Sequence, residues 1–140
     1  MDTSKRAWAW SILLLTTLFA LSSSSNLATP DIGFHSTKDK IGHFFIFGLL
    51  ATSILRIECF RCSGLRGTVS AAAIVIVYGA LDEFRQSLTP GRAVELADWI
   101  ADSLGAIVAV ATYRTLVPYR LLLEWKVIKP AKRRRSNASN

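Results

Sequence analysis

One histidine and several acidic residues have the types and spacing that suit acid–base chemistry. A histidine beside a carboxylate can transfer protons near neutral pH, which makes His43 with Glu83 or Asp98 a candidate catalytic pair. Asp98 and Asp102 are four residues apart and would share one helix face, as would Asp39 and His43. The spacing therefore predicts an ionisable cluster, provided that the segments carrying these residues meet.

Basic and amide side chains accompany this acidic set and suit the binding of polar ligands. Lys40, Arg85 and Arg92 could hold phosphate or carboxylate groups, Arg92 through two parallel hydrogen bonds. Gln86, three residues after Glu83, adds an amide to the same region. The candidate binding residues are Asp39, Lys40, His43, Glu83, Gln86, Arg92, Asp98 and Asp102.

Four apolar stretches must position these residues, at about 8–26, 41–57, 64–81 and 97–116. Their lengths are close to the roughly 20 residues that a helix needs to cross the hydrocarbon core of a bilayer. Helices rather than strands satisfy every backbone group of such a segment internally. The sequence thus predicts an all-α integral membrane bundle of four transmembrane helices, in a membrane domain over 1–120 with a basic tail over 121–140.

The basic residues predict the orientation of this bundle. With both termini in the cytoplasm, 13 of the 17 Lys and Arg residues fall at the inner side, as the positive-inside rule requires. The candidate polar residues then gather at the outer ends of the helices. A lone carboxylate at the depth of Asp102 would cost about 2.5–3.5 kcal/mol, so this residue should face the bundle and be protonated or paired. The cations available to it are Lys40, Arg85, Arg92 and, if charged, His43.

Two segments allow a second interpretation. The first apolar stretch follows Lys5 and Arg6 and precedes Ser22–Ser25, so it could be a signal peptide, although no clear cleavage site follows it. The basic tail could suggest nucleic-acid binding, but its position beside a span favours attraction to anionic membrane lipids. We therefore expect membrane lipids, and no nucleic acid, as its partner.

Composition and cysteine spacing exclude several other classes. The chain is 51% hydrophobic and 19% charged, which excludes a disordered protein, and two cysteines are too few for a disulfide scaffold. Cys59 and Cys62 form a C-x-x-C pair with neither a second pair for zinc nor a thioredoxin-like context, so we interpret it as a chance occurrence. A single histidine in the cluster is thin evidence for a metal site, and we expect no metal and no cofactor.

A wider pattern resembles a known family. The pattern runs over about half of the chain and consists of Asp39-Lys40-x-x-His43-Phe44, Glu83-x-x-Gln86, Pro90-Gly91-Arg92, Asp98 and Gly105. It resembles the VanZ-like family, small membrane proteins named after a teicoplanin-resistance determinant. The resemblance implies a multi-pass protein of the bacterial inner (cytoplasmic) membrane, with these polar positions in use. The family usually has Asn where this chain has Asp102, and it has no settled biochemical activity to transfer.

Three functions are compatible with these features. The polar cluster could bind, or change access to, an envelope component such as a lipid-linked cell-wall precursor or a lipid headgroup, and so give low-level glycopeptide tolerance. It could instead be interhelical glue that fixes the packing of a structural or assembly protein. The third function is an intramembrane acid–base enzyme using His43 with Glu83 or Asp98, although no nucleophile has a recognised motif around it.

Overall fold

The structure is a computed structural model, and it describes residues 3–23, 34–88 and 95–124. In these ranges every regular element is a helix, which confirms the predicted all-α class. The helices are α1 (Thr3–Ser22), α2 (Phe34–Leu55), α3 (Glu58–Cys62), α4 (Gly64–Ser87), α5 (Leu96–Thr115) and α6 (Val117–Glu124).

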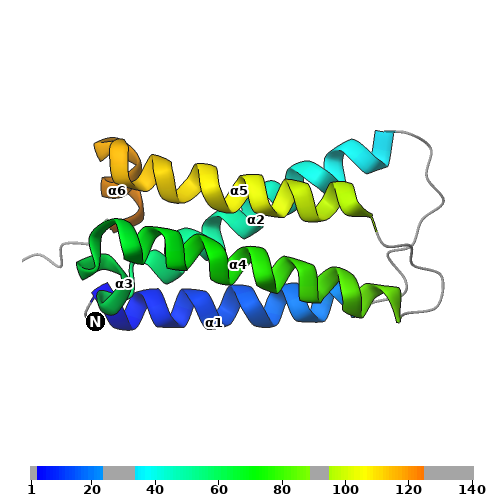
Figure 1. The fold of residues 1–140 in the computed structure, drawn as a ribbon, viewed down its shortest axis with the longest axis horizontal. Coiled ribbons are helices and arrows are strands. Elements are labelled where there is room, and N and C mark those ends of the chain that lie inside the picture. The colour runs from blue at the N-terminus through cyan, green and yellow to red at the C-terminus, as the bar shows by residue number, and fades with distance from the viewer. Residues whose placement is uncertain (1–2, 24–33, 89–94, 125–140) are drawn as a thin grey trace, which may run out of the picture.

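The four long helices lie side by side and alternate in direction along the chain (Figure 1). The start of α1, the ends of α2 and α5, and the short helices α3 and α6 gather at one end of the bundle, which we call the α3/α6 end. The ends of α1 and α4 and the starts of α2 and α5 lie at the opposite end, which we call the polar end. Helices α2 and α5 therefore run in the same direction, with α4 and α1 packed beside them.

Two of these helices are long and apolar enough to cross a membrane, namely α4 and α5, and Lys40–Leu55 within α2 is a shorter apolar segment. Each of the four expected spans falls largely within a long helix, although α2 begins before position 41 and α4 continues past position 81. The short helices α3 and α6 were not predicted, and the expected tail over 121–140 begins inside α6. Four crossings and the location of the termini remain predictions.

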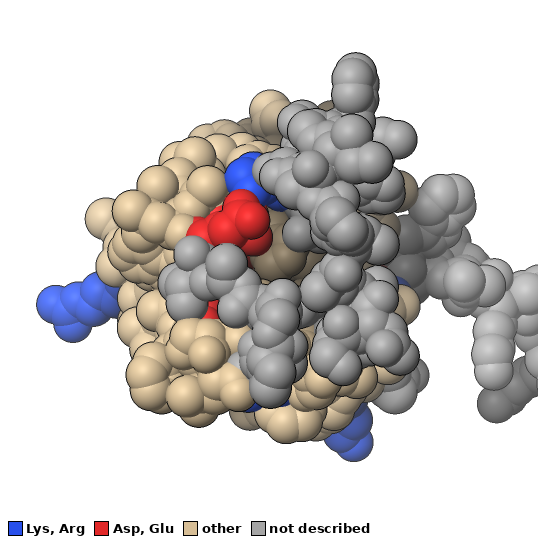
Figure 2. All heavy atoms as spheres, turned by 90° about the vertical axis from the view of Figure 1, so that its right-hand side faces the viewer, with Lys and Arg blue, Asp and Glu red and all other residues tan. Residues whose placement is uncertain are grey.

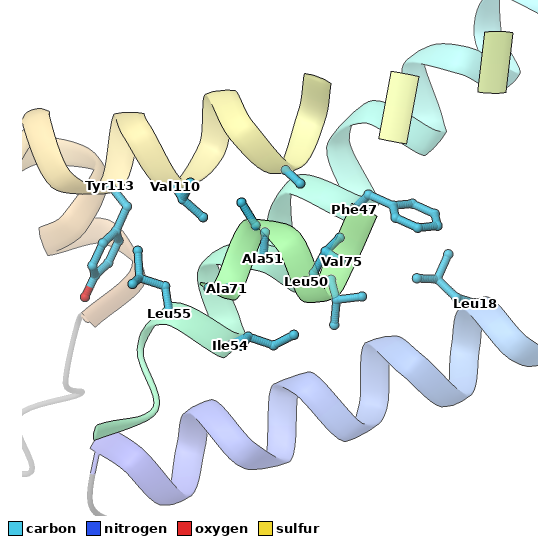
Figure 3. Packing of buried hydrophobic residues seen from close by; sticks show 12 residues of the cluster. Leu18, Phe47, Leu50, Ala51, Ile54, Leu55, Ala71, Val75, Val110 and Tyr113 are labelled. Atoms are coloured by element: carbon cyan, nitrogen blue, oxygen red, sulfur yellow. The ribbon is translucent and has the colours of Figure 1, made fainter. Parts of the chain in front are cut away.

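A compact apolar core lies between α2, α4 and α5 (Figure 3). Phe47, Leu50 and Leu55 of α2 and Val75 of α4 have no exposed surface. Leu18 of α1 belongs to the same cluster, so the first helix packs as a member of the bundle. Many large apolar side chains on the outer faces are exposed, an arrangement that suits a lipid surrounding.

Glycine allows α2 and α5 to approach each other closely. A Cβ atom added to Gly105 would lie 2.1 Å from the backbone oxygen of Phe44. One added to Gly48 would lie 3.0 Å from the backbone oxygen of Gly105. Small residues of this kind permit tight helix packing without a strong hydrophobic driving force. This contact sets how far apart α2 and α5 lie. It therefore also sets the distance between the polar residues that the two helices carry about one turn nearer to the polar end.

Candidate functional site

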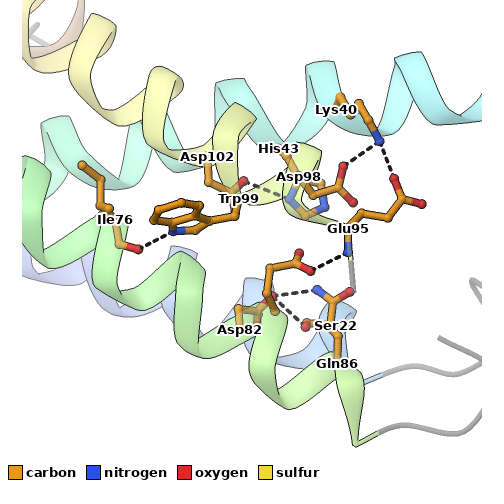
Figure 4. A network of polar contacts seen from close by, with 11 residues as sticks. Ser22, Lys40, His43, Ile76, Asp82, Gln86, Glu95, Asp98, Trp99 and Asp102 are labelled. Atoms are coloured by element: carbon orange, nitrogen blue, oxygen red, sulfur yellow. Dashed lines mark hydrogen bonds and ion pairs between the residues drawn. The ribbon is translucent and has the colours of Figure 1, made fainter. Parts of the chain in front are cut away.

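Helices α2 and α5 each contribute two polar side chains, and each of those on α2 pairs with one on α5 (Figure 4). Lys40 Nζ lies 2.9 Å from Asp98 Oδ1 and 2.6 Å from Glu95 Oε2. The hydrogen bonds to Asp98 and Glu95 raise the pKa of Lys40 above its ordinary value, so this residue stays charged at physiological pH. Lys40 thereby fixes the beginning of α5 against α2.

The second pair joins His43 and Asp102 at greater depth. His43 Nδ1 lies 3.0 Å from Asp102 Oδ1, and Asp102 is only 1% exposed. The His43 ring stacks on Phe47, with ring centroids 5.9 Å apart, which fixes its orientation. Gly79 of α4 faces Asp102, since a Cβ atom there would lie 3.2 Å from Oδ2. The structure thus pairs the buried carboxylate with the histidine among the four cations that the sequence offered.

Glu83 adds a side chain of α4 to the polar residues at the beginning of α5. It is 6% exposed, and its Oε2 accepts a hydrogen bond of 3.2 Å from the backbone N–H of Glu95, the residue that precedes α5. A carboxylate can accept about four hydrogen bonds, so this contact leaves acceptor capacity on Glu83. Together the three helices place Lys40, His43, Glu83, Asp98 and Asp102 in one cluster.

Asp82 is a site residue that the spacing argument missed. It is buried, and its carboxylate accepts hydrogen bonds from Ser22 Oγ at 2.7 Å, Gln86 Nε2 at 3.0 Å and Arg85 Nη2 at 2.9 Å. Arg85 also donates to the backbone oxygen of Phe19 at 3.2 Å. The spacing of Asp82 to Arg85 and Gln86, three and four residues, is the signal that could have found this network. Asp82 thereby links α1 to α4 next to the cluster.

The other residues predicted for the site lie in different places. Gln86 bonds to Asp82 and lies beside the cluster on α4. Arg85 is held by Asp82 rather than directed at a ligand. Arg92 and the side chain of Asp39 lie outside the described residues. Within the described part of the chain, no group of three or more His, Cys, Asp or Glu residues is arranged to hold a metal ion.

The electrostatic character of the cluster is acidic. Among the described residues, three carboxylates lie in the cluster and two lie directly beside it; they belong to Glu83, Asp98 and Asp102, and to Asp82 and Glu95. The basic side chains that contact them are Lys40, Arg85 and His43. Figure 2, which views the polar end, shows acidic surface gathered next to a basic side chain. The described cluster therefore suits a ligand that donates hydrogen bonds better than it suits an anionic ligand.

The fold and this cluster define a class, a helical bundle with apolar outer faces and a buried polar site at one end. The sequence model of the VanZ/LLP1 family matches residues 3–118, from α1 into α6, and the chain belongs to this family. Family membership and the two apolar helices α4 and α5 indicate a membrane protein. No curated protein and no solved structure matches the chain.

Proposed function

We propose that the chain is a multi-pass protein of the bacterial inner (cytoplasmic) membrane, with four spans and both termini in the cytoplasm. The alternating directions of the four long helices support this topology, and so does the concentration of basic residues towards the α3/α6 end. The contacts of α1 with Asp82 and Arg85, together with a family match that begins in α1, favour a first helix that stays in the bundle over a cleaved signal peptide. The polar end then faces outwards.

We further propose that the cluster at the polar end binds an envelope component, either a lipid-linked cell-wall precursor or a lipid headgroup. The observation that carries this proposal is the convergence of ionisable side chains from α2, α4 and α5 on one buried place. Buried charges are costly in a membrane and mark functional sites more often than they improve stability. The remaining acceptor capacity of Glu83 suits the amines, amides and hydroxyls of a peptide or sugar headgroup. Binding at the outer surface would alter glycopeptide access and give low-level teicoplanin tolerance.

The test compares tolerance and protein abundance in a susceptible bacterium that expresses the chain. His43→Ala and Glu83→Gln should abolish tolerance while an immunoblot of the membrane fraction shows unchanged protein. Glu58→Gln is the matched control, because Glu58 is an exposed glutamate at the start of α3, at the other end of the bundle. Unchanged tolerance in both site variants would refute the proposal.

A structural role is the first alternative, and the links between helices favour it. Ser22 joins α1 to Asp82, and Lys40 joins α2 to Asp98, both through direct side-chain contacts. If these contacts act only as packing glue, abundance and tolerance should fall in parallel in the site variants. Such a parallel loss would replace ligand binding with this alternative.

An intramembrane acid–base enzyme is the second alternative. The observation that favours it is the His43–Asp102 pair, because a carboxylate that orients a histidine is a common part of proton-transfer sites. This pairing differs from the expected partners Glu83 and Asp98. Turnover of a purified lipid-linked substrate that is lost in Glu83→Gln would favour the enzyme over a binding protein.

A further inference from the structure

A second buried ionisable group lies at the α3/α6 end, far along the bundle from the cluster described above. Arg56 follows the end of α2 and is only 3% exposed. Its Nε and Nη2 atoms are buried and have no hydrogen-bond partner in the structure. Buried guanidinium groups are normally paired, because their N–H groups lose the hydrogen bonds that water would provide.

The two unpartnered atoms form one edge of the guanidinium group. The N–H bonds of Nε and Nη2 point in the same direction and match two oxygen atoms of a phosphate or carboxylate. Lysine offers no such planar edge, so an arginine at this position is specific for bidentate recognition. The chemistry of the side chain therefore selects an oxyanion.

The described neighbours of Arg56 do not supply that oxyanion. Glu124 and Tyr113 interact with it electrostatically, yet Arg56 forms no ion pair among the described residues. Tyr113 Oη donates a hydrogen bond to Glu124 Oε1, and no oxygen of Glu124 lies within 4 Å of the Arg56 guanidinium group as an ion pair. Arg6 also lies near enough to interact with Arg56 and adds positive charge.

The surroundings favour an anion from outside the chain. At the α3/α6 end the described basic residues outnumber the acidic ones by seven to two; they are Lys5, Arg6, Arg56, Arg61, Arg66, Arg114 and Arg120, against Glu58 and Glu124. Such a surplus attracts phosphate groups, whether they belong to membrane lipids or to soluble compounds.

We propose that Arg56 binds a phosphate group at the α3/α6 end of the bundle, through Nε and Nη2. The site is distinct from the acidic cluster and does not depend on the function proposed for it. Its phosphate comes from the headgroup of an anionic phospholipid or from a soluble phosphate compound. Both sources present the two oxygen atoms that this edge of the guanidinium group can bind.

The experiment measures the thermal unfolding midpoint of the purified full-length chain in a neutral detergent. Wild-type protein is titrated with phosphatidylglycerol in one arm and with inorganic phosphate in the other, each against chloride at equal ionic strength. The midpoint should rise with ligand concentration in at least one arm, because the ligand binds the folded state. A rise in the lipid arm alone identifies a lipid headgroup, and a rise with inorganic phosphate identifies a soluble source.

Two variants test whether Arg56 is responsible. Arg56→Lys keeps the charge and loses the bidentate edge, so its apparent affinity should be about tenfold weaker. Arg66→Lys is the control, because Arg66 is an exposed arginine near the start of α4 at the same end. A purely structural Arg56 would lower the midpoint without ligand and leave the ligand-induced rise intact, which would overturn the proposal.

The wild-type titrations keep the proposal falsifiable even if Arg56→Lys does not fold. No rise in either arm would overturn it. The alternative occupant is a carboxylate of this chain outside the described residues, such as Asp2. Asp2→Asn would then destabilise the protein and the wild type would not respond to phosphate, which would also overturn the proposal.

Discussion

Replacing Gly105 with alanine should separate α2 from α5 and thereby disturb the neighbouring polar cluster. The added Cβ atom would lie 2.1 Å from the backbone oxygen of Phe44, and ordinary contacts are 3.4 Å or longer. Backbone atoms of two packed helices cannot yield as the end of a flexible side chain can. The helices must therefore move apart by more than an ångström. This movement takes place about one helical turn from the His43–Asp102 pair.

The expected cost of this substitution can be worked from its parts. Overpacking costs about 1–3 kcal/mol, and a lost hydrogen bond to a charged group costs about 1.5–3 kcal/mol. The better helix propensity of alanine offsets about 1 kcal/mol, which leaves a net destabilisation of about 1.5–5 kcal/mol. Reversible unfolding of the full-length chain by denaturant in detergent measures this difference in the free energy of unfolding.

Gly42 provides the matched control on α2. A Cβ atom added there meets nothing within 4 Å, so Gly42→Ala should stabilise the protein by about 0.5–1 kcal/mol through helix propensity alone. If Gly105→Ala were as stable as Gly42→Ala, the close approach of α2 and α5 would be wrong. The positions of His43 and Asp102 would then not depend on this approach.

Two further perturbations address the links at the polar end. Since Asp98 raises the pKa of Lys40, the stabilisation by this pair should be constant from neutral pH up to about pH 10.5 and be lost as the pH rises through the higher folded-state pKa. Denaturant unfolding of wild type and Lys40→Met across this pH range checks it, and a wild-type loss already near neutral pH would contradict it. Ser22→Ala should cost about 1–2 kcal/mol because Asp82 loses a buried hydrogen bond, and α1 should become more accessible to protease. The control Ser87→Ala, which changes an exposed hydroxyl of α4, should stay within about 0.5 kcal/mol of wild type, and equal effects of the two changes would disprove the link.

The sequence predicted the helices better than it predicted which side chains pair with one another. Long apolar runs require helices, and the four-residue spacing of Asp98 and Asp102 placed them on one face of α5, where both now meet α2. The expected depth of Asp102 also predicted that it would be protonated or paired, and the structure pairs it with His43. Which cation pairs with it depends on how far apart α2 and α5 lie and how each is rotated. Those quantities follow from backbone contacts at Gly48 and Gly105 that a spacing pattern does not encode.

Residues whose roles depend on a distant segment were the ones missed. Asp82 becomes a link only because Ser22 of α1 lies beside it, sixty positions away in the sequence. Arg56 lies at the end of the expected span 41–57, where the sequence pattern gives it no role, and only the structure shows that it is buried at the α3/α6 end. The short helices α3 and α6 have only five and eight residues, which is too short for an apolar run that indicates a helix.

The proposed function requires that α2, α4 and α5 form one binding site for an envelope component at the polar end. An experimental structure of the full-length chain in a lipid bilayer tests it most directly. We expect headgroup density in contact with Glu83 and His43, with the His43–Asp102 and Lys40–Asp98 pairs intact. Side chains that are separated and individually hydrated, with no headgroup between the three helices, would contradict it.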